Sequence, residues 1–439
     1  MSLESRRLRG RIAACAIALA TAAPSATNAG EIGYFALENA STVVALDLGD
    51  GSVVSRIDVG PLPRFTTASA DGLTIAVVNE GDQTISIVDT ATNSVVETLS
   101  IADIVPPFPR AAYENHGGMG TGADIENDDV SESDAMIEVP PGLASGGEIA
   151  LSPDGGTIYL AALYFGVSAY DRATGAVRPL GGAAGETGSL AGASNGLLRL
   201  SADGERIFVP GFSGFGVVDT ATMQMTGMVS GIEILMHPAL EITSDATRLF
   251  SAPHLALTNT TARVVVKAAD LETFAIETID LDLDRQANGL LQFRGMFHAT
   301  ETALGPDDRS FYTVRSFPYT RSPPIALSPG TTPPLGVHQF ELSVVDLENG
   351  ATIATALLDQ ASAGIGVFAD GSLLTVVHPL ANRIDVRDAR TLDVLRSVNI
   401  GPTPRAGRSF ITASGGAAGT LDKSDKPAAA PADVPAIKF

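Results

Sequence analysis

Seven aspartates recur along this chain, and each one closes a short run of alternating apolar residues. The runs are TVVALD, TISIVD, GVSAYD, GFGVVD, VVKAAD, ELSVVD and RIDVRD, which end at Asp47, Asp89, Asp171, Asp219, Asp270, Asp346 and Asp388. Alternation with a period of two is typical of a half-buried strand, and turn-forming residues follow each run. We interpret the aspartates as turn caps rather than catalytic groups, because such carboxylates bind the backbone of the following turn.

A second landmark, a turn of the Asp-Gly type, precedes most of these runs. These turns contain Asp71, Asp154, Asp203, Asp245, Asp307 and Asp370. Apolar runs flank each landmark, so the repeated unit contains four strands. Asp47 and Asp89 lie 42 positions apart, as do Asp346 and Asp388. A single small sheet buries both faces only when neighbours stack on it, so the repeat predicts an all-β chain, a seven-bladed β-propeller of four-stranded antiparallel blades.

One unit carries a family resemblance. Residues 75–101, IAVVNEGDQTISIVDTATNSVVETLSI, resemble the YVTN-type repeat of extracytoplasmic, surface-layer-protein-like seven-bladed propellers, with Asn79 and Asp89 at the two characteristic positions. The resemblance is close in the second unit, looser elsewhere and loosest in the fifth and sixth. It implies a propeller related in fold to lactonase-like and quinoprotein amine dehydrogenase propellers, and it implies no particular reaction.

The first unit lacks an innermost strand, and the C-terminal region supplies a candidate. Residues 401–414, GPTPRAGRSFITAS, echo residues 60–69, GPLPRFTTAS, which lead into the second unit. We therefore predict that residues 408–413 complete blade 1 and close the ring, which removes an unpaired sheet edge. The propeller is expected to span residues 30–414. Residues 415–439 are low in complexity and are expected to be disordered.

The N-terminus has the three parts of a secretory signal peptide over residues 1–29. Arginines precede an apolar run at 12–22, and small residues at 27–29 offer a cleavage point. The run is too short to span a bilayer, so we expect a periplasmic or secreted protein with no integral membrane segment after cleavage. The sole cysteine, Cys15, would leave with the signal.

Charge restricts the partners. The formal net charge is -22, which argues against nucleic acid and anionic membranes. A small anionic molecule or a periplasmic protein is the expected partner. No nucleophile elbow, phosphate-binding loop, zinc-protease helix or dinucleotide fingerprint occurs in a supporting context.

Strand order places the histidines on one face of the ring, opposite the aspartate turns. Neutral imidazoles gathered there are suited to a transition metal, and the candidates are His237, His254, His298 and His378. No spacing such as HxH fixes a shared geometry. A metal-free polar pocket and unrelated surface histidines therefore stay open as alternatives.

Arginines at the same end are candidates for binding a carboxylate or phosphate. Three of them follow a proline in the blade crossings PLPR, PFPR and PTPR. The full candidate set is Arg64, Arg110, Arg294, Arg315 and Arg405, with Glu38 as a possible base or oxygen ligand. The alternative is that these crossings are plain connectors in which arginine binds nearby carbonyls.

Two insertions depart from the repeat, at residues 101–145 and 316–337. The first contains the acidic residues Asp124, Glu126, Asp128, Asp129, Glu132 and Asp134. Such a loop is either a solvated lid or a calcium site, although EF-hand spacing is absent. Both insertions are expected to shape access to the funnel.

Three functions stay open from sequence alone. The first is an exported ligand- or protein-binding or scaffold propeller acting through its loop-rich funnel face. The second is a metal- or Arg/His-dependent periplasmic enzyme, a lactonase-like hydrolase or an oxidoreductase. The third is a propeller subunit of a quinoprotein-type dehydrogenase.

Overall fold

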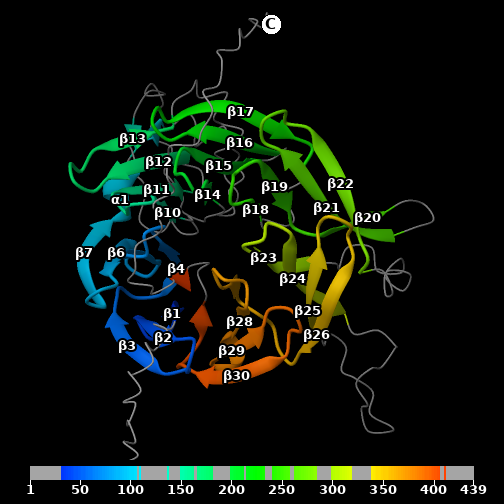
Figure 1. Ribbon diagram of the computed structural model, residues 1–439. Coiled ribbons are helices and arrows are strands. Elements are labelled where there is room, and N and C mark those ends of the chain that lie inside the picture. The colour runs from blue at the N-terminus through cyan, green and yellow to red at the C-terminus, as the bar shows by residue number, and fades with distance from the viewer. Residues whose placement is uncertain are drawn as a thin grey trace, which may run out of the picture.

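The chain folds as a ring of antiparallel sheets (Figure 1). The computed structural model describes residues 31–105, 108–109, 136–137, 149–162, 166–180, 198–211, 214–232, 240–257, 262–283, 298–318, 338–405 and 410–411. Within these residues the strands form seven blades of four antiparallel strands, and helix is almost absent. The predicted fold class is therefore confirmed.

Three consecutive blades carry the site described below. Blade 7 contains β27 (Ile365–Val367), β28 (Leu373–His378), β29 (Arg383–Asp388) and β30 (Val394–Asn399). Blade 1 contains β31 (Pro404–Arg405) and β32 (Phe410–Ile411) on the inside, then β1 (Ile32–Leu37), β2 (Thr42–Asp47) and β3 (Val53–Asp58). Blade 2 contains β4 (Pro63–Ala68), β5 (Thr74–Asn79), β6 (Thr84–Asp89) and β7 (Ser94–Ser100).

The other four blades repeat the order. Blade 3 contains β10 (Ile149–Leu151), β11 (Thr157–Ala162), β12 (Gly166–Asp171) and β13 (Val177–Pro179). Blade 4 contains β14 (Arg199–Leu200), β15 (Arg206–Gly211), β16 (Gly214–Asp219) and β17 (Gln224–Ser230). Blade 6 contains β23 (His298–Leu304), β24 (Ser310–Pro318), β25 (His338–Asp346) and β26 (Thr352–Leu358).

Blade 5 has a broken second strand. It contains β18 (Leu240–Ile242), β19 (Arg248–Ser251), β20 (His254–Leu257), β21 (Ala262–Asp270) and β22 (Ile276–Leu281), and both β19 and β20 pair with β21. The break falls at Ala252 and Pro253, because proline has no N–H for the ladder. His254 consequently lies inside the second strand of the blade rather than at its end.

The remaining described elements are short. They are α1 (Ile101–Ile104), the 3-10 turn η2 (Pro379–Ala381) and the pair β8 (Phe108–Pro109) with β9 (Met136–Ile137). In the described part of the chain, no helix has the length and apolar character needed to cross a membrane.

Burial follows the position of a strand within its blade. The second strand β5 is buried at almost every residue because blades cover both of its faces, whereas the outermost strand β7 alternates between exposed and half-buried residues. Apolar side chains of neighbouring blades form one core cluster at each of the seven interfaces. Blade stacking thus provides the core that a single sheet lacks.

C-terminal strands close the ring, as predicted. Both β31 and β32 pair antiparallel with β1. Blades 7 and 1 also share a core cluster that includes Phe35 and Val377. Arg56 Nη2 donates to the Ile400 carbonyl at 3.0 Å and Arg396 Nη1 to the Leu48 carbonyl at 2.8 Å, so two arginines link the outer parts of the same seam.

Several predicted segments lie outside the described residues. These are the signal peptide at 1–29, the acidic cluster at 124–134, most of the blade 6 insertion and the tail at 415–439. They stay predictions.

Candidate functional site

The strand-closing aspartates act as turn caps. Asp89 Oδ1 accepts hydrogen bonds from the Thr92 backbone N–H at 2.7 Å and the Thr92 hydroxyl at 2.8 Å. These bonds lower the pKa of Asp89. The carboxylates of Asp47, Asp171, Asp219, Asp270, Asp346 and Asp388 also accept backbone N–H bonds from their own turns. This end of the ring is therefore regular and structural.

At the opposite end, blades 7, 1 and 2 share one loop geometry between their second and third strands. The last loop residue is left-handed in each case, with φ of 57° at Asn382, 48° at Ser41 and 56° at Gln83. Its carbonyl accepts the N–H of Ile400, Val59 or Ile101, which begins the crossing to the next blade. Loops that share this left-handed residue and its hydrogen bond thus present different side chains: Pro379-Leu380-Ala381, Glu38-Asn39-Ala40 and Glu80-Gly81-Asp82.

Two adjacent crossings also repeat each other, with the sequence Gly-Pro-X-Pro-Arg. The middle residues, Leu62 and Thr403, have φ of 52° and 47°. A left-handed residue is unusual before proline, and such strain costs on the order of 1 kcal/mol. Each strained carbonyl accepts the N–H of the glutamate after the second strand, from Glu80 at 3.1 Å and from Glu38 at 3.2 Å. The crossing and the loop are locked together in both blades.

In both crossings, the arginine at the end of the sequence forms an ion pair with that glutamate. Arg64 Nη1 lies 2.9 Å from Glu80 Oε2, and Arg405 Nε lies 2.9 Å from Glu38 Oε2. In blade 2, Arg64 is the extra residue of a β-bulge between Pro63 and Phe65, a device that re-aims a side chain. The guanidinium side chains keep 45% and 36% of their surface exposed. They are ordered by their partners and still open to solvent.

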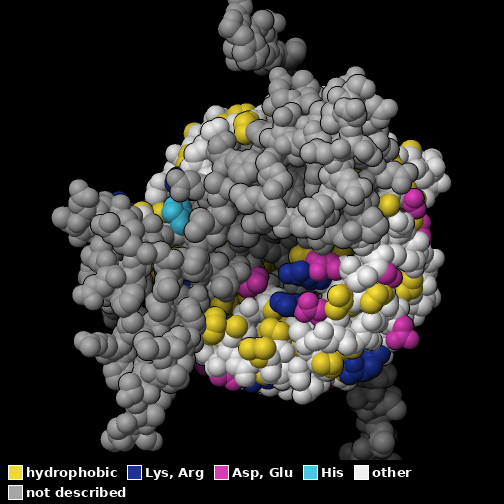
Figure 2. All heavy atoms as spheres, turned by 180° about the vertical axis from the view of Figure 1, so that it is seen from behind, with side chains coloured by type: hydrophobic (Ala, Val, Ile, Leu, Met, Phe, Trp, Pro, Cys, Tyr) yellow, Lys and Arg dark blue, Asp and Glu magenta, His cyan; other side chains and the backbone are white. Residues whose placement is uncertain are grey.

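Exposed apolar residues accompany these ion pairs. Leu380 is 79% exposed on η2, and Leu62 is 45% exposed in the blade 2 crossing. The Asn382 side chain accepts the Thr403 N–H at 3.0 Å, which ties the Leu380 loop to the blade 1 crossing. Figure 2 shows one side of the ring, where acidic and basic side chains adjoin near the centre with hydrophobic side chains around them. We call Glu38, Leu62, Arg64, Glu80, Leu380 and Arg405 the 7-1-2 face.

Polar residues fill one equivalent buried position beneath this end of the ring. Asn79, Arg315 and His378 are each the sixth residue of the second strand, in blades 2, 6 and 7, and each is buried. Each is hydrogen-bonded to the neighbouring third strand: Asn79 to Ser86, Arg315 to Glu341 and His378 to Asp385. Burial lowers the pKa of Arg315, and the attraction of Glu341 opposes this shift.

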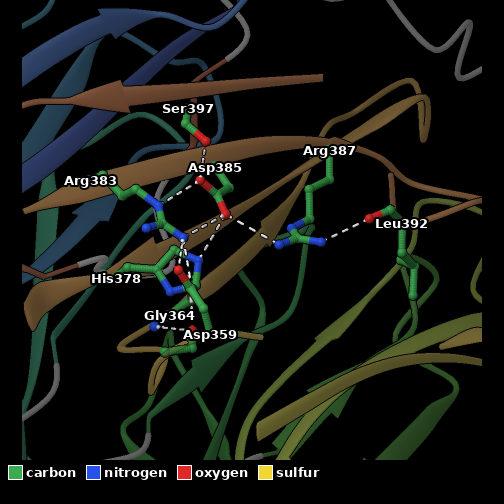
Figure 3. Close-up of polar contacts among 9 residues, drawn as sticks. Asp359, Gly364, His378, Arg383, Asp385, Arg387, Leu392 and Ser397 are labelled. Carbon is green, nitrogen blue, oxygen red and sulfur yellow. Dashed lines mark hydrogen bonds and ion pairs between the residues drawn. The ribbon is translucent and has the colours of Figure 1, made fainter. Parts of the chain in front are cut away.

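In blade 7 this position belongs to a charged network (Figure 3). Asp385 accepts hydrogen bonds from His378 Nε2 at 3.1 Å, Arg383 Nε at 3.0 Å, Arg387 Nη2 at 3.2 Å and Ser397 Oγ at 2.6 Å. Burial raises the pKa of Asp385, but these hydrogen bonds outweigh burial and hold the pKa well below its usual range. Arg383 also binds Asp359 at 2.8 Å, which connects blade 7 with blade 6.

The structure describes the side chains of two of the four predicted metal-binding histidines. His378 is fully buried, and its Nε2 donates to Asp385, because an ionised carboxylate only accepts hydrogen bonds. His254 is half-buried on blade 5, with Nδ1 3.3 Å from the Ala252 carbonyl. His237 and the His298 side chain lie outside the description. Among the described residues, no group of three or more His, Cys, Asp or Glu is arranged to hold a metal ion.

The predicted arginine set separates into three groups. Arg64 and Arg405 form the duplicated ion pairs, together with Glu38. Arg315 lies inside the interface of blades 5 and 6, paired with Glu341 rather than exposed on the funnel. Arg110 and Arg294 lie outside the described residues.

Glu80, Leu380 and Asp385 were not predicted. Alignment of the repeats carries a signal for Glu80, since it follows the second strand of blade 2 as Glu38 follows that of blade 1. The alignment also carries a signal for Asp385, which lies three residues before the strand-closing Asp388. Ser86 occupies the same position in blade 2. Nothing in the sequence marks Leu380 as exposed.

No protein-family model and no characterised protein sequence matches the chain. Among solved structures, the chain is similar to hydrazine synthase of Kuenenia stuttgartiensis, with a TM-score of 0.51 and 15% identity over 79% of this chain and 88% of that chain. It is also similar to the β-propeller domain of Myceliophteria thermophila Cps50 (Swd1), with a TM-score of 0.50 and 11% identity over 81% of this chain and 96% of that chain. At such identities the likeness establishes the propeller fold alone.

Proposed function

We propose that this chain is an exported, YVTN-type binding or scaffold propeller that engages its ligand through the 7-1-2 face. The observation that carries the proposal is the duplication of a strained crossing with an arginine held by a glutamate. Leu62 and Thr403 are left-handed before proline in both copies. A plain connector needs neither this conformation nor an ordered, half-exposed guanidinium at its end.

The chemistry of the face supports recognition of a ligand. Interface centres are enriched in arginine and in large apolar side chains that become buried on binding. Leu380, at 79% exposure, is such an apolar group in the free protein. The shared loop backbone supports these side chains on rigid blades, which favours binding without a large conformational change.

Export is the second part of the proposal, and it rests on residues 1–29. A fusion of this segment to a reporter that is active only outside the cytoplasm tests it. We expect activity from the fusion, and none after the arginines that precede the apolar run are changed to glutamate. Reporter activity without the segment would contradict the expectation.

Capture experiments test the binding face. Purified mature protein is cross-linked in the extracytoplasmic fraction of its source organism, using wild type, Leu380→Asp and Leu73→Asp. Leu73 is the matched control, because it is 59% exposed in the Asp-Gly turn of blade 2 at the opposite end. We expect wild type and Leu73→Asp to capture the same partner and Leu380→Asp to lose it. Equal capture by all three proteins would overturn the proposal.

A further inference from the structure

The outermost strand of every blade has one edge that pairs with no other strand in the described part of the chain. Such an edge carries free N–H and C=O groups, which pair readily with a strand of another chain. Soluble proteins block this pairing with charged residues, proline or a β-bulge, and a glycine weakens the strand itself. The seven outer strands therefore differ in how well their edges are protected.

Six of the seven outer strands are protected by their composition. The protecting residues are Arg56 and Asp58 in β3, Glu97 in β7, Arg178 and Pro179 in β13, Gly227 in β17, Glu277 and Asp280 in β22, and Arg396 in β30. The seventh, β26, has the sequence TIATALL and contains no charged residue, proline or glycine. A β-bulge falls at Ile353, but β3, β7, β17 and β30 have a bulge at the equivalent position. Composition is therefore what distinguishes β26.

The exposed side of β26 is mostly apolar and uncharged. Ile353 and Leu357 keep 47% and 45% of their surface exposed, and Thr355 is exposed between them. The nearest carboxylates in the sequence, Glu348 and Asp359, are each paired with an arginine.

Charge limits where two copies of this chain can meet. The formal net charge is -22, so two copies repel each other overall, and contact is favoured at an edge that is itself uncharged. Only β17 and β26 among the outer strands are uncharged. The exposed residues of β17 are Gln224, Thr226 and Ser230, which are polar. The edge that combines neutrality with exposed apolar side chains is therefore β26.

The sequence of β26 is also symmetric about Thr355. Ala354 and Ala356 flank this threonine, and Ile353 and Leu357 follow on either side. Antiparallel pairing of two such strands about a two-fold axis at Thr355 places Ile353 of each copy opposite Leu357 of the other. Apolar pairs and Thr–Thr pairs across strands both stabilise an antiparallel sheet. An unrelated strand gains nothing from this symmetry, whereas a two-fold dimer requires a self-complementary surface.

We propose that two copies of this chain associate through β26, by antiparallel edge-to-edge pairing about Thr355. The two blade 6 sheets then form one continuous sheet. β26 lies on the outer rim of the ring (Figure 1), and no residue of the 7-1-2 face belongs to blade 6. The association is therefore independent of ligand binding at that face.

Analytical ultracentrifugation of the purified mature protein over a range of concentrations tests the proposal. We expect wild type to form a concentration-dependent dimer. Leu357→Glu and Ile353→Lys are each expected to weaken the association by about tenfold or more, because each places a charge opposite an apolar residue. Leu395→Lys is the matched control, since Leu395 is 56% exposed at the bulge of β30, and it is expected to associate as wild type does.

Mixing the two weakened variants tests the register. In a mixed pair the glutamate at position 357 of one copy faces the lysine at position 353 of the other, and the remaining Ile353 faces the remaining Leu357. We expect the mixture to form a one-to-one heterodimer at a concentration where each variant alone is monomeric.

Three results would overturn the proposal. They are a wild type that stays monomeric up to about 1 mM, a dimer that Leu357→Glu leaves unchanged, and a mixture of the two variants that does not associate. The second result would place the dimer interface on another surface, and the third would exclude pairing about Thr355.

Discussion

The two ends of the same blades differ in how their charged side chains are bound. At the aspartate end, each carboxylate is bound by the turn that follows it, and the arrangement recurs in all seven blades. At the other end of blades 7, 1 and 2, the loop backbones are equally regular, but their side chains differ and stay exposed. Turns whose carboxylates are bound by their own backbone specify the ring, whereas loops that share one geometry but differ in their side chains are free to specify a ligand.

The largest expected effect on stability lies in the charged network of blade 7, at the end of the ring that carries the 7-1-2 face. Asp385→Ala leaves His378, Arg383 and Arg387 without their shared carboxylate, and we expect a loss of about 3–5 kcal/mol in the free energy of unfolding. Asp359→Ala removes an exposed partner of Arg383 and is expected to cost less than about 1 kcal/mol. Urea denaturation measures both. Equal losses would show that the network is not a buried charge centre.

A turn cap at the aspartate end is expected to have a smaller effect. Asp89→Ala removes the acceptor for the Thr92 N–H and hydroxyl, which we expect to lower the free energy of unfolding by less than Asp385→Ala does, because the Asp89 carboxylate is exposed. The variant is expected to retain ligand binding at the 7-1-2 face. Loss of binding with an unchanged unfolding curve would assign function to the wrong end.

The stability of the protein is expected to depend on pH through Glu31, which lies at the interface of blades 7 and 1. Burial, and then repulsion by Asp370, raise the pKa of Glu31 to about 7. A raised folded-state pKa means that stability is fully present below the unfolded pKa and is lost as pH rises through the folded value. Wild type is therefore expected to lose on the order of 1 kcal/mol between about pH 4.5 and 7, after allowance for solvent screening. In Glu31→Gln, denaturation curves across this range should lack that loss.

The smallest effect on stability is expected at the ion pairs of the 7-1-2 face. Arg64→Gln breaks an exposed pair and is expected to change the unfolding free energy by less than about 1 kcal/mol, because such pairs are well solvated. A calorimetric scan measures this change. A larger loss would mean that Arg64 chiefly holds the fold, and it would remove the contrast between the two ends.

Much of the fold was predictable because the aspartates mark one fixed position in every repeat. They count the blades, and the echo of residues 60–69 at 401–414 predicts the closing strand that pairs with β1. Blade 5 was harder to align, since Pro253 breaks its second strand. Strand order alone also placed Arg64, Arg405 and Glu38 at one end of the ring.

The rest of the site depends on distances that a repeat pattern does not contain. Arg315 and His378 look like surface candidates in sequence, yet both point between blades, where Glu341 and Asp385 neutralise or bind them. Which face of a strand a residue occupies depends on register, and one position reverses it. The exposure of Leu380 follows from the η2 turn, which no strand pattern predicts.

The central claim is that the ligand binds the 7-1-2 face. Hydrogen exchange tests this claim most directly. Amide exchange of the mature protein is compared with and without its captured partner. We predict protection in the crossings and loops at 38–41, 60–64, 379–382 and 401–405, with unchanged exchange in the turns after Asp47, Asp89 and Asp388. Protection of those aspartate turns, with no change in the loops, would contradict the account.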